Sequence, residues 1–165
     1  MSYRFLDHTA DVGAEIAAPS LGDLFSEAAA AFTDTVTVHS AVRAAEERRV
    51  EATADGLEEL MVDWLGELLY LFDSEGLLVG EAEVEIARAE AAPESGAPES
   101  GWHLSELNDD RGLEGGWHLS ARVHGEVYEP ERHPVKVLIK AVTYHELVVR
   151  KSTEGGWFAR VIFDI

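Results

Sequence analysis

The chain has 165 residues, of which 46% are hydrophobic, a size and composition that suit one globular domain with its own core. It contains no cysteine, which excludes disulfides, thiolate zinc sites and cysteine nucleophiles. Its formal net charge of −19 argues against unaided binding to RNA or DNA, and it is compatible with a strongly solvated surface, a basic partner protein or bound cations.

The first part of the chain predicts short strands and an amphipathic helix. Apolar and polar residues alternate over residues 3–6, 12–16 and 49–53, which favours β-strands. Ser20 has the features of a helix N-cap. The apolar residues that follow it recur at spacings of three and four as far as Phe32, so we expect a helix with one apolar stripe.

A second helix is expected to begin at Asp55 and to end near Gly76, because glycine suits a left-handed C-terminal cap. Its apolar stripe is wide and comprises Leu57, Leu60, Met61, Trp64, Leu65, Leu68, Leu71 and Phe72. This spacing is typical of core packing, so we predict that Met61 and Trp64 lie in the core and not in a cofactor site.

The second half of the chain is predicted to be mostly β. Glu81–Ala87 alternates acidic and apolar residues, which indicates a strand with one solvated face. Further strands are expected over residues 117–125, 135–149 and 157–163, the last two joined by a hairpin turn at Gly155-Gly156. We therefore predict an α+β domain, with an antiparallel β-sheet of about six to eight strands packed with two amphipathic helices.

Residues 88–115 differ from the rest in composition. Residues 94–96 recur at 99–101, and residues 101–105 recur at 116–120, which indicates local duplication and not a solenoid. We expect a single domain over residues 1–165 with a mobile low-complexity insertion at about 88–115. Deletion of this insertion is expected to leave the fold intact.

Two features bear on location. No run of eighteen apolar residues is present, so no membrane span is expected. The first eight residues include Asp7 and His8, where a secretory signal would place its apolar segment. We therefore expect a cytoplasmic protein without membrane association.

Groups that can bind a metal lie at both ends of the chain. Asp7, His8 and Asp11 precede an expected strand, and the sequence closes with Asp164 and the α-carboxylate of Ile165. Hard cations such as Ca²⁺ and Mg²⁺ take oxygen ligands from distant parts of a chain, so we expect the fold to join the two ends in one oxygen-ligand site. The alternative is that Asp11 caps a turn, Asp164 is an ordinary exposed end and His8 is a hydrogen-bonded structural histidine.

Lys140 lies between apolar residues in the strand expected from Val135. Such a lysine either extends its ammonium group to water or presents a positioned cation to a phosphate or a carboxylate. The chain has no glycine-rich phosphate loop, H-E-x-x-H, G-x-S-x-G or EF-hand motif. An enzyme that hydrolyses or transfers nucleotides on its own is therefore not indicated.

Six segments, in order along the chain, resemble the archease family. They are residues 5–13, Leu24-Phe25, residues 60–70, Gly125-Glu126, residues 139–145 and Asp164-Ile165. The match covers nearly the whole chain except residues 88–115. The segments are specific as a set and weak individually.

The resemblance implies a protein cofactor of an RtcB-type RNA ligase in tRNA splicing and RNA repair, with no catalytic residue of its own. An archease is expected to promote guanylylation of the ligase's active-site histidine and to allow multiple turnover. The resemblance also implies a metal site, usually assigned to calcium, held by Asp11, Asp164 and Ile165. Lys140 would act at the ligase's active site. Asp7 and His8 lie beside Asp11 in the sequence, and we interpret them as support for the metal ligands.

With this partner, the acidic surface would face the basic RNA-binding ligase, and no direct contact with nucleic acid is expected. Two other hypotheses remain. One is a free-standing metal-dependent hydrolase that uses His8, Asp11 and Asp164. The other is an acidic, chaperone-like binding module.

Overall fold

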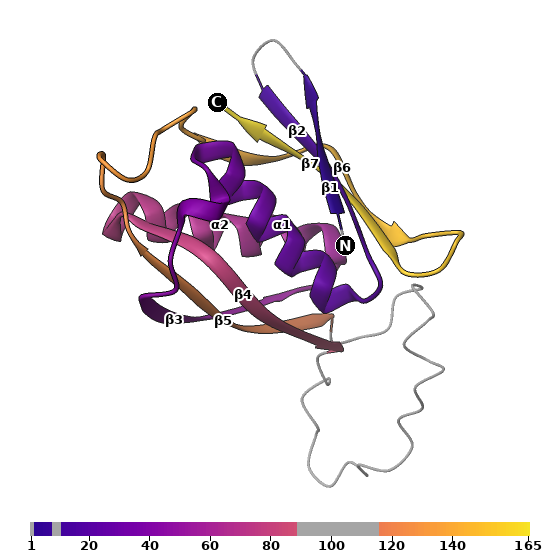
Figure 1. Cartoon of the computed structure of the whole chain (residues 1–165). Coiled ribbons are helices and arrows are strands. Elements are labelled where there is room, and N and C mark those ends of the chain that lie inside the picture. The colour runs from indigo at the N-terminus through magenta and orange to yellow at the C-terminus, as the bar shows by residue number, and fades with distance from the viewer. Residues whose placement is uncertain (1, 8–10, 89–115) are drawn as a thin grey trace, which may run out of the picture.

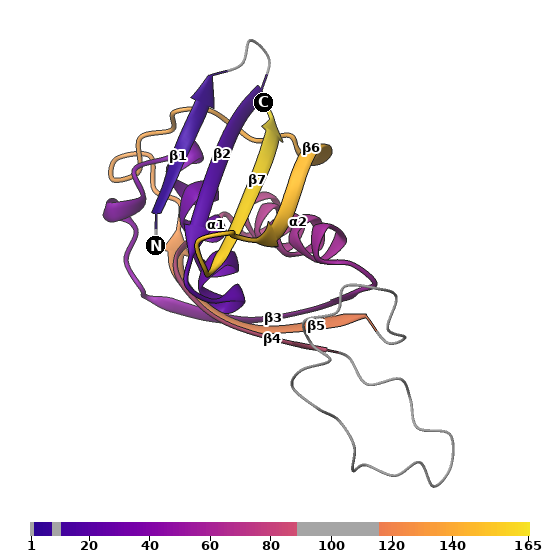
Figure 2. The same ribbon diagram turned by 90° about the vertical axis from the view of Figure 1, so that its right-hand side faces the viewer.

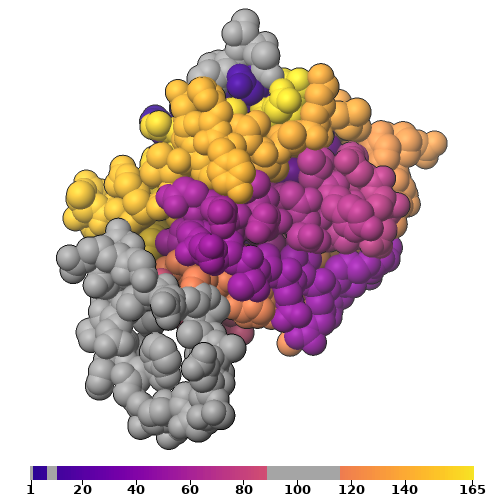
Figure 3. All heavy atoms as spheres, turned by 180° about the vertical axis from the view of Figure 1, so that it is seen from behind, coloured from indigo at the N-terminus to yellow at the C-terminus, as the bar shows by residue number. Residues whose placement is uncertain are grey.

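Two antiparallel sheets enclose a layer of two helices in the computed structural model of the chain, which describes residues 2–7, 11–88 and 116–165 (Figures 1 and 2). From behind, the helical layer in purple and magenta reaches the surface between the two sheets (Figure 3). In this described part, no helix is long and apolar enough to cross a membrane.

The four-stranded sheet joins the two ends of the chain. Its strands lie in the order β1 (Ser2–Asp7), β2 (Asp11–Ala18), β7 (Trp157–Asp164) and β6 (Ala141–Lys151). All neighbours are antiparallel. Because β2 pairs with β7, the N-terminal hairpin and the C-terminal hairpin form one sheet, and the C-terminus lies beside the start of β2 (Figure 2).

The three-stranded sheet covers the other side of the helices. Its order is β3 (Glu46–Ala54), β5 (Trp117–Val127) and β4 (Leu77–Arg88), again antiparallel. In β4 the glutamates at positions 81, 83 and 85 are exposed, as their alternation predicts.

Helix α1 (Leu21–Val36) begins as predicted, since Ser20 Oγ accepts a hydrogen bond from the Asp23 N–H at 3.1 Å. A short 3-10 turn, η1 (His39–Ala41), follows it. Helix α2 (Leu57–Glu75) ends on Gly76, whose φ of 70° is the predicted left-handed cap. Its predicted start at Asp55 is wrong, because the N-cap is Gly56, which has no side chain to cap the helix.

The core fills the space between the helices and both sheets. Met61 and Trp64 are fully buried, as predicted, and Trp64 Nε1 donates to the Phe25 carbonyl at 2.9 Å, which ties α2 to α1. Helix α1 is buried on more than one face and not along a single stripe, because it lies between the two sheets. Its alanines at 28, 29 and 31 provide the small side chains that this close packing requires.

The prediction of two helices with antiparallel strands is confirmed, with seven strands in the described part of the chain. The strands divide between two sheets, which the periodicity does not specify. The strand expected from Val135 begins only at Ala141. Residues 135–140 instead run along the end of α1, where the Lys136 N–H donates to the Val36 carbonyl at 2.8 Å. Apart from Arg88, which ends β4, the expected insertion at 88–115 lies outside the described residues.

Candidate metal site at the end of the four-stranded sheet

The sheet register places Asp11 directly opposite Asp164 at the end of the β2–β7 pair. Side chains of directly opposed residues in antiparallel strands lie on the same face, with Cβ atoms about 4.5–5.5 Å apart. Their neighbours along the strands, Val161 and Phe163 on β7 and Ala14 on β2, are buried against the helices. Because side chains alternate along a strand, the two carboxylates share the outer face, away from the helices.

Two like charges in this position repel each other. Among the described residues, no hydrogen bond or ion pair engages the carboxylate of Asp11 or Asp164. A pair of opposed acids without a protein cation is suited to bind a cation from solution.

Ile165, whose main-chain carboxylate is the third predicted ligand, follows β7 at the same end of the sheet. Ile165 is half-buried, and its side chain packs against the core cluster. This packing fixes the position of Ile165 at the end of β7. The α-carboxylate of Ile165 and the two aspartates therefore offer three oxygen-donor groups, which leaves coordination positions for water or for groups of a partner.

Lys140 joins this group through its backbone. Its N–H donates to the Asp164 carbonyl at 2.7 Å, and the next residue, Ala141, pairs with Asp164 in the sheet. The prediction that Lys140 lies inside a strand is wrong, because it immediately precedes β6. Its side chain is exposed, so its ammonium group is available to a partner.

The structure describes the two predicted supporting residues only in part. Asp7 ends β1 with its backbone opposite Val12. Its side chain and all of His8 lie outside the described residues. Within the described ranges, no group of three or more His, Cys, Asp or Glu side chains is placed to hold a metal ion. The predicted site has two such side chains, and its third ligand is a main-chain carboxylate.

Exposed apolar side chains flank Lys140, and sequence reasoning did not identify them as functional. Leu138 is 58% exposed and Tyr144 is 59% exposed. The β6–β7 register shifts between Thr143 and Val148, which places Tyr144 in an irregular part of the strand. Large apolar side chains exposed beside a charged site are typical of protein–protein contacts.

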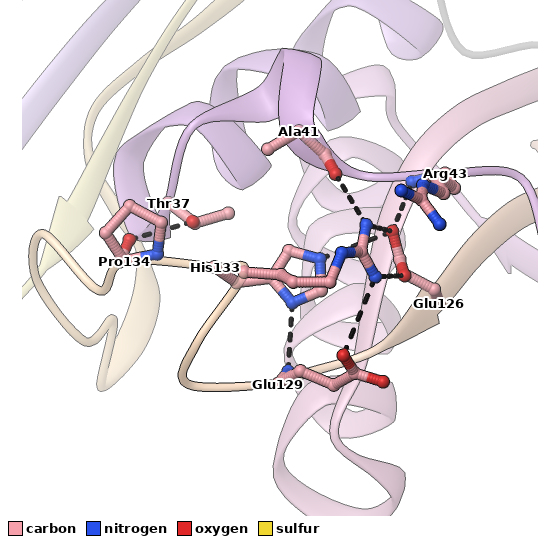
Figure 4. A network of polar contacts seen from close by, with 8 residues as sticks. Thr37, Ala41, Arg43, Glu126, Glu129, His133 and Pro134 are labelled. Atoms are coloured by element: carbon pink, nitrogen blue, oxygen red, sulfur yellow. Dashed lines mark hydrogen bonds and ion pairs between the residues drawn. The ribbon is translucent and has the colours of Figure 1, made fainter.

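Away from the candidate metal site, the carboxylate of Glu126 lies near the end of β5. Glu126 is almost fully buried, at 7% exposure. Arg132 makes a two-pronged ion pair with it, and the Arg43 N–H donates to it at 2.6 Å (Figure 4). These bonds, that of Arg132 above all, lower the pKa of Glu126 to about 2. The cluster anchors the loop after β5 to the segment before β3, so we interpret it as structural.

His133 completes this cluster and is fully buried. Its Nδ1 accepts a hydrogen bond from the Glu129 N–H at 2.9 Å (Figure 4). Its Nε2 lies 3.3 Å from the Glu126 carboxylate. Since Nδ1 accepts from a backbone N–H, the proton of the neutral ring lies on Nε2, which finds no hydrogen-bond partner among the described residues.

Comparison with known proteins identifies one family whose members match nearly the whole chain. The model of the Archease protein family (MTH1598/TM1083) matches residues 3–165. The protein archease of Methanosarcina mazei is 36% identical over 163 residues, which cover 99% of this chain and 95% of that protein. The protein archease of Methanopyrus kandleri is 33% identical over 165 residues, with both chains covered completely.

Two solved structures resemble the fold. The solution structure of Methanobacterium thermoautotrophicum protein 1598 has a TM-score of 0.72 and 31% identity, covering 99% of this chain and 98% of that one. A crystal structure from Thermotoga maritima, described as an archease and possible chaperone, has a TM-score of 0.53 and 19% identity. It covers 97% of this chain and 94% of its own, and at that identity it supports the fold alone.

Proposed function

The chain belongs to the archease family, and from this premise we propose that it activates an RtcB-type RNA ligase in tRNA splicing and RNA repair. The activation would consist of promoting guanylylation of the ligase and its multiple turnover. The observation that carries the proposal is the register of the four-stranded sheet. It brings Asp11 and Asp164 together at one end of the sheet, where Ile165 follows and the Lys140 N–H donates to the Asp164 carbonyl.

In this proposal Asp11, Asp164 and the α-carboxylate of Ile165 hold a divalent cation, with Ca²⁺ as the expected ion. Ca²⁺ takes six to eight oxygen ligands, so a bound ion would keep positions for water, phosphate or carboxylate of the partner. The opposed and otherwise unpartnered acids support this assignment. The exposed ammonium group of Lys140 would compensate negative charge on a phosphate in the ligase's active site.

The surface of the chain supports a protein partner in preference to nucleic acid. Its net charge of −19 would repel RNA and attract a basic RNA-binding ligase. Leu138 and Tyr144 would supply apolar contacts on either side of Lys140. In this role the protein works in the cytoplasm without catalytic residues of its own.

The test is a guanylylation assay of the ligase with GTP and Ca²⁺, with and without this protein. We expect stimulation by the wild-type protein and none by Asp11→Ala, Asp164→Ala or a protein extended beyond Ile165. Full stimulation by the extended protein would exclude the α-carboxylate as a ligand. Turnover of a phosphate ester by the isolated protein would favour the hydrolase hypothesis, and full activity of Asp11→Ala would favour a chaperone-like binding module.

A further inference from the structure

The two sheets have four edge strands, and a free strand edge is a template for pairing with another chain. The edge of β4 is covered by α1. Ser26 Oγ donates to the Ala82 carbonyl at 2.8 Å, and Thr33 Oγ1 donates to the Val79 carbonyl at 2.6 Å. Helix side chains thus occupy the carbonyl groups that an added strand would use.

The edge of β6 is obstructed in two ways. The Glu58 carboxylate of α2 accepts a hydrogen bond from the Val149 N–H at 3.1 Å. The register shift between Thr143 and Val148 contains Glu146, whose φ is 54°. A bulge of this kind bends the edge and interrupts regular pairing.

The edge of β3 is protected by charge. Five of its residues are charged, namely Glu46, Glu47, Arg48, Arg49 and Glu51. Arg48 also reaches across to Glu75 at the end of α2, at 2.8 Å. Charged side chains on an edge strand disfavour pairing with another strand.

In the part of the chain that the structure describes, the edge of β1 has neither a covering helix nor a bulge, and only two of its six residues, Arg4 and Asp7, are charged. Its six residues pair with β2 without a register shift, from Ser2 opposite Ala17 to Asp7 opposite Val12. Phe5 is 40% exposed, and β1 forms the outer edge of the sheet in Figure 2. Among the described residues, hydrogen bonds to the backbone of β1 come from β2 alone.

The charges near β1 bear on the choice of partner: α1 contributes Asp34 and Glu27, while Arg4 of β1 is already paired with Glu15. The Tyr3 hydroxyl donates to Asp34 of α1 at 3.2 Å. Burial, together with the negative charges of Asp34 and Glu27, raises the pKa of Tyr3 to about 12. A second copy of this chain would also have a net charge of −19. The repulsion between two such acidic chains disfavours self-pairing.

We propose that β1 is a docking edge to which an extended segment of the RNA ligase adds as a fifth strand of the four-stranded sheet. The segment would carry apolar residues beside Tyr3 and Phe5 and Lys or Arg beside the acids of α1, and its backbone would pair with the free edge of β1. The identity of this partner rests on the proposed function.

Residue-resolved hydrogen exchange of the full chain, free and in complex with the ligase, tests this mode of docking. Successive N–H groups of a strand point to opposite sides, so β2 protects only alternate amides of β1. In the complex the outward set should slow by at least about tenfold, while the set that faces β2 stays unchanged. Protection without this alternation, or outward amides already protected in the free protein, would overturn the proposal.

A substitution on the edge gives a second measure. Phe5→Glu should weaken binding to the ligase by at least about tenfold, as expected for loss of an apolar contact and added repulsion. Tyr70→Glu is the matched control, since Tyr70 is an aromatic residue of α2 with 62% exposure. Binding by Phe5→Glu equal to that of the control would contradict docking at β1.

The two proposals fail in different ways. If the ligase is bound and stimulated but the outward amides of β1 are unchanged, docking at β1 is wrong and the proposed function stands. If the ligase is neither bound nor stimulated, both are wrong.

Discussion

Glu126 and the Asp11–Asp164 pair are carboxylates at strand ends, but the fold surrounds them differently. Glu126 has a two-pronged ion pair with Arg132 and a hydrogen bond from the Arg43 N–H. Asp11 and Asp164 face each other, and no described residue bonds to their carboxylates. The difference separates a carboxylate that stabilises the protein from carboxylates whose counter-charge has to come from outside.

Other acids of the fold follow the pattern of Glu126. Glu15, on the same outer face as Asp11, is shared by Arg160 and Arg4, and hydrogen bonds from both lower its pKa. Asp34 accepts bonds from the His39 N–H and the Tyr3 hydroxyl and pairs with Lys136. Among the described residues, Asp11 and Asp164 have no such partner although they lie directly opposite each other, and this makes them candidates for binding an external cation.

The largest expected effect is on metal binding. Asp164→Asn should lower the affinity for Ca²⁺ by at least about a hundredfold, since loss of a supporting residue alone typically costs 10–100-fold. Without metal it should leave stability unchanged or raise it by about 0.2–1 kcal/mol, because it removes a repulsion between opposed charges. Calorimetric titration and urea unfolding in EGTA measure the two quantities.

Calcium should therefore stabilise the wild-type protein but not Asp164→Asn. At about 100 times its Kd, the ion should add about 2.7 kcal/mol to the free energy of unfolding, and it should add nothing to Asp164→Asn. The control is Glu126→Gln, which should bind Ca²⁺ with wild-type affinity. Equal stabilisation of all three proteins by Ca²⁺ would place the ion elsewhere.

The next largest expected effect is the loss of stability on substitution of Glu126. Glu126→Gln should lower the free energy of unfolding by about 2–3 kcal/mol, because it leaves the Arg132 guanidinium without its charged partner in a partly buried position. Urea unfolding at neutral pH measures this loss. A loss as small as that of an exposed glutamate, such as Glu154→Gln, would show that the cluster does not stabilise the fold.

Glu126→Gln should also change how the free energy of unfolding depends on pH. The pKa of Glu126 is about 2 in the folded protein, against an ordinary value of 4.5. A carboxyl whose pKa is lower in the folded than in the unfolded state stabilises the fold above its unfolded pKa. The stability difference between wild type and Glu126→Gln should therefore be constant at neutral pH and shrink as the pH falls from about 4.5 to about 2. Other acids titrate in both proteins and cancel in this difference.

Local features of the fold could be predicted from the sequence. Ser20 as an N-cap, Gly76 as a C-cap and the turn at Gly155-Gly156 each depend on a few neighbouring residues, and the structure confirms all three. The division into two sheets depends on pairings between distant strands, which periodicity does not encode. The alanines of α1 were the available sign that this helix is buried on more than one face.

The candidate site, too, could be predicted only in part, because it depends on contacts between distant segments. Carboxylates at both chain ends suggested one site, and the β2–β7 register places Asp11 and Asp164 opposite each other. The error at Lys140 arose because Val135 to Ile139 have strand-forming side chains, while a hydrogen bond from Lys136 to the end of α1 holds this segment out of the sheet. The buried role of Glu126 was missed because an acid and an arginine six residues apart give no sign of burial, and the contact from Arg43 is remote in the sequence.

The smallest expected effect on stability is that of Lys140→Met, and Arg132→Met is the variant to compare with it. Lys140 contacts Asp164 only through its backbone N–H, which Lys140→Met retains, so this variant should change the free energy of unfolding by less than about 0.5 kcal/mol. Arg132→Met leaves the buried carboxylate of Glu126 without its charged partner and should lower the free energy of unfolding by clearly more than Lys140→Met does. The order should reverse when stimulation of the ligase is measured at a temperature where both variants are folded. Lys140→Met should then lose about tenfold in stimulation, and Arg132→Met should lose none. If Lys140→Met stimulates the ligase fully, its ammonium group has no part in activation, and the charge at this end of the sheet acts through the bound cation alone.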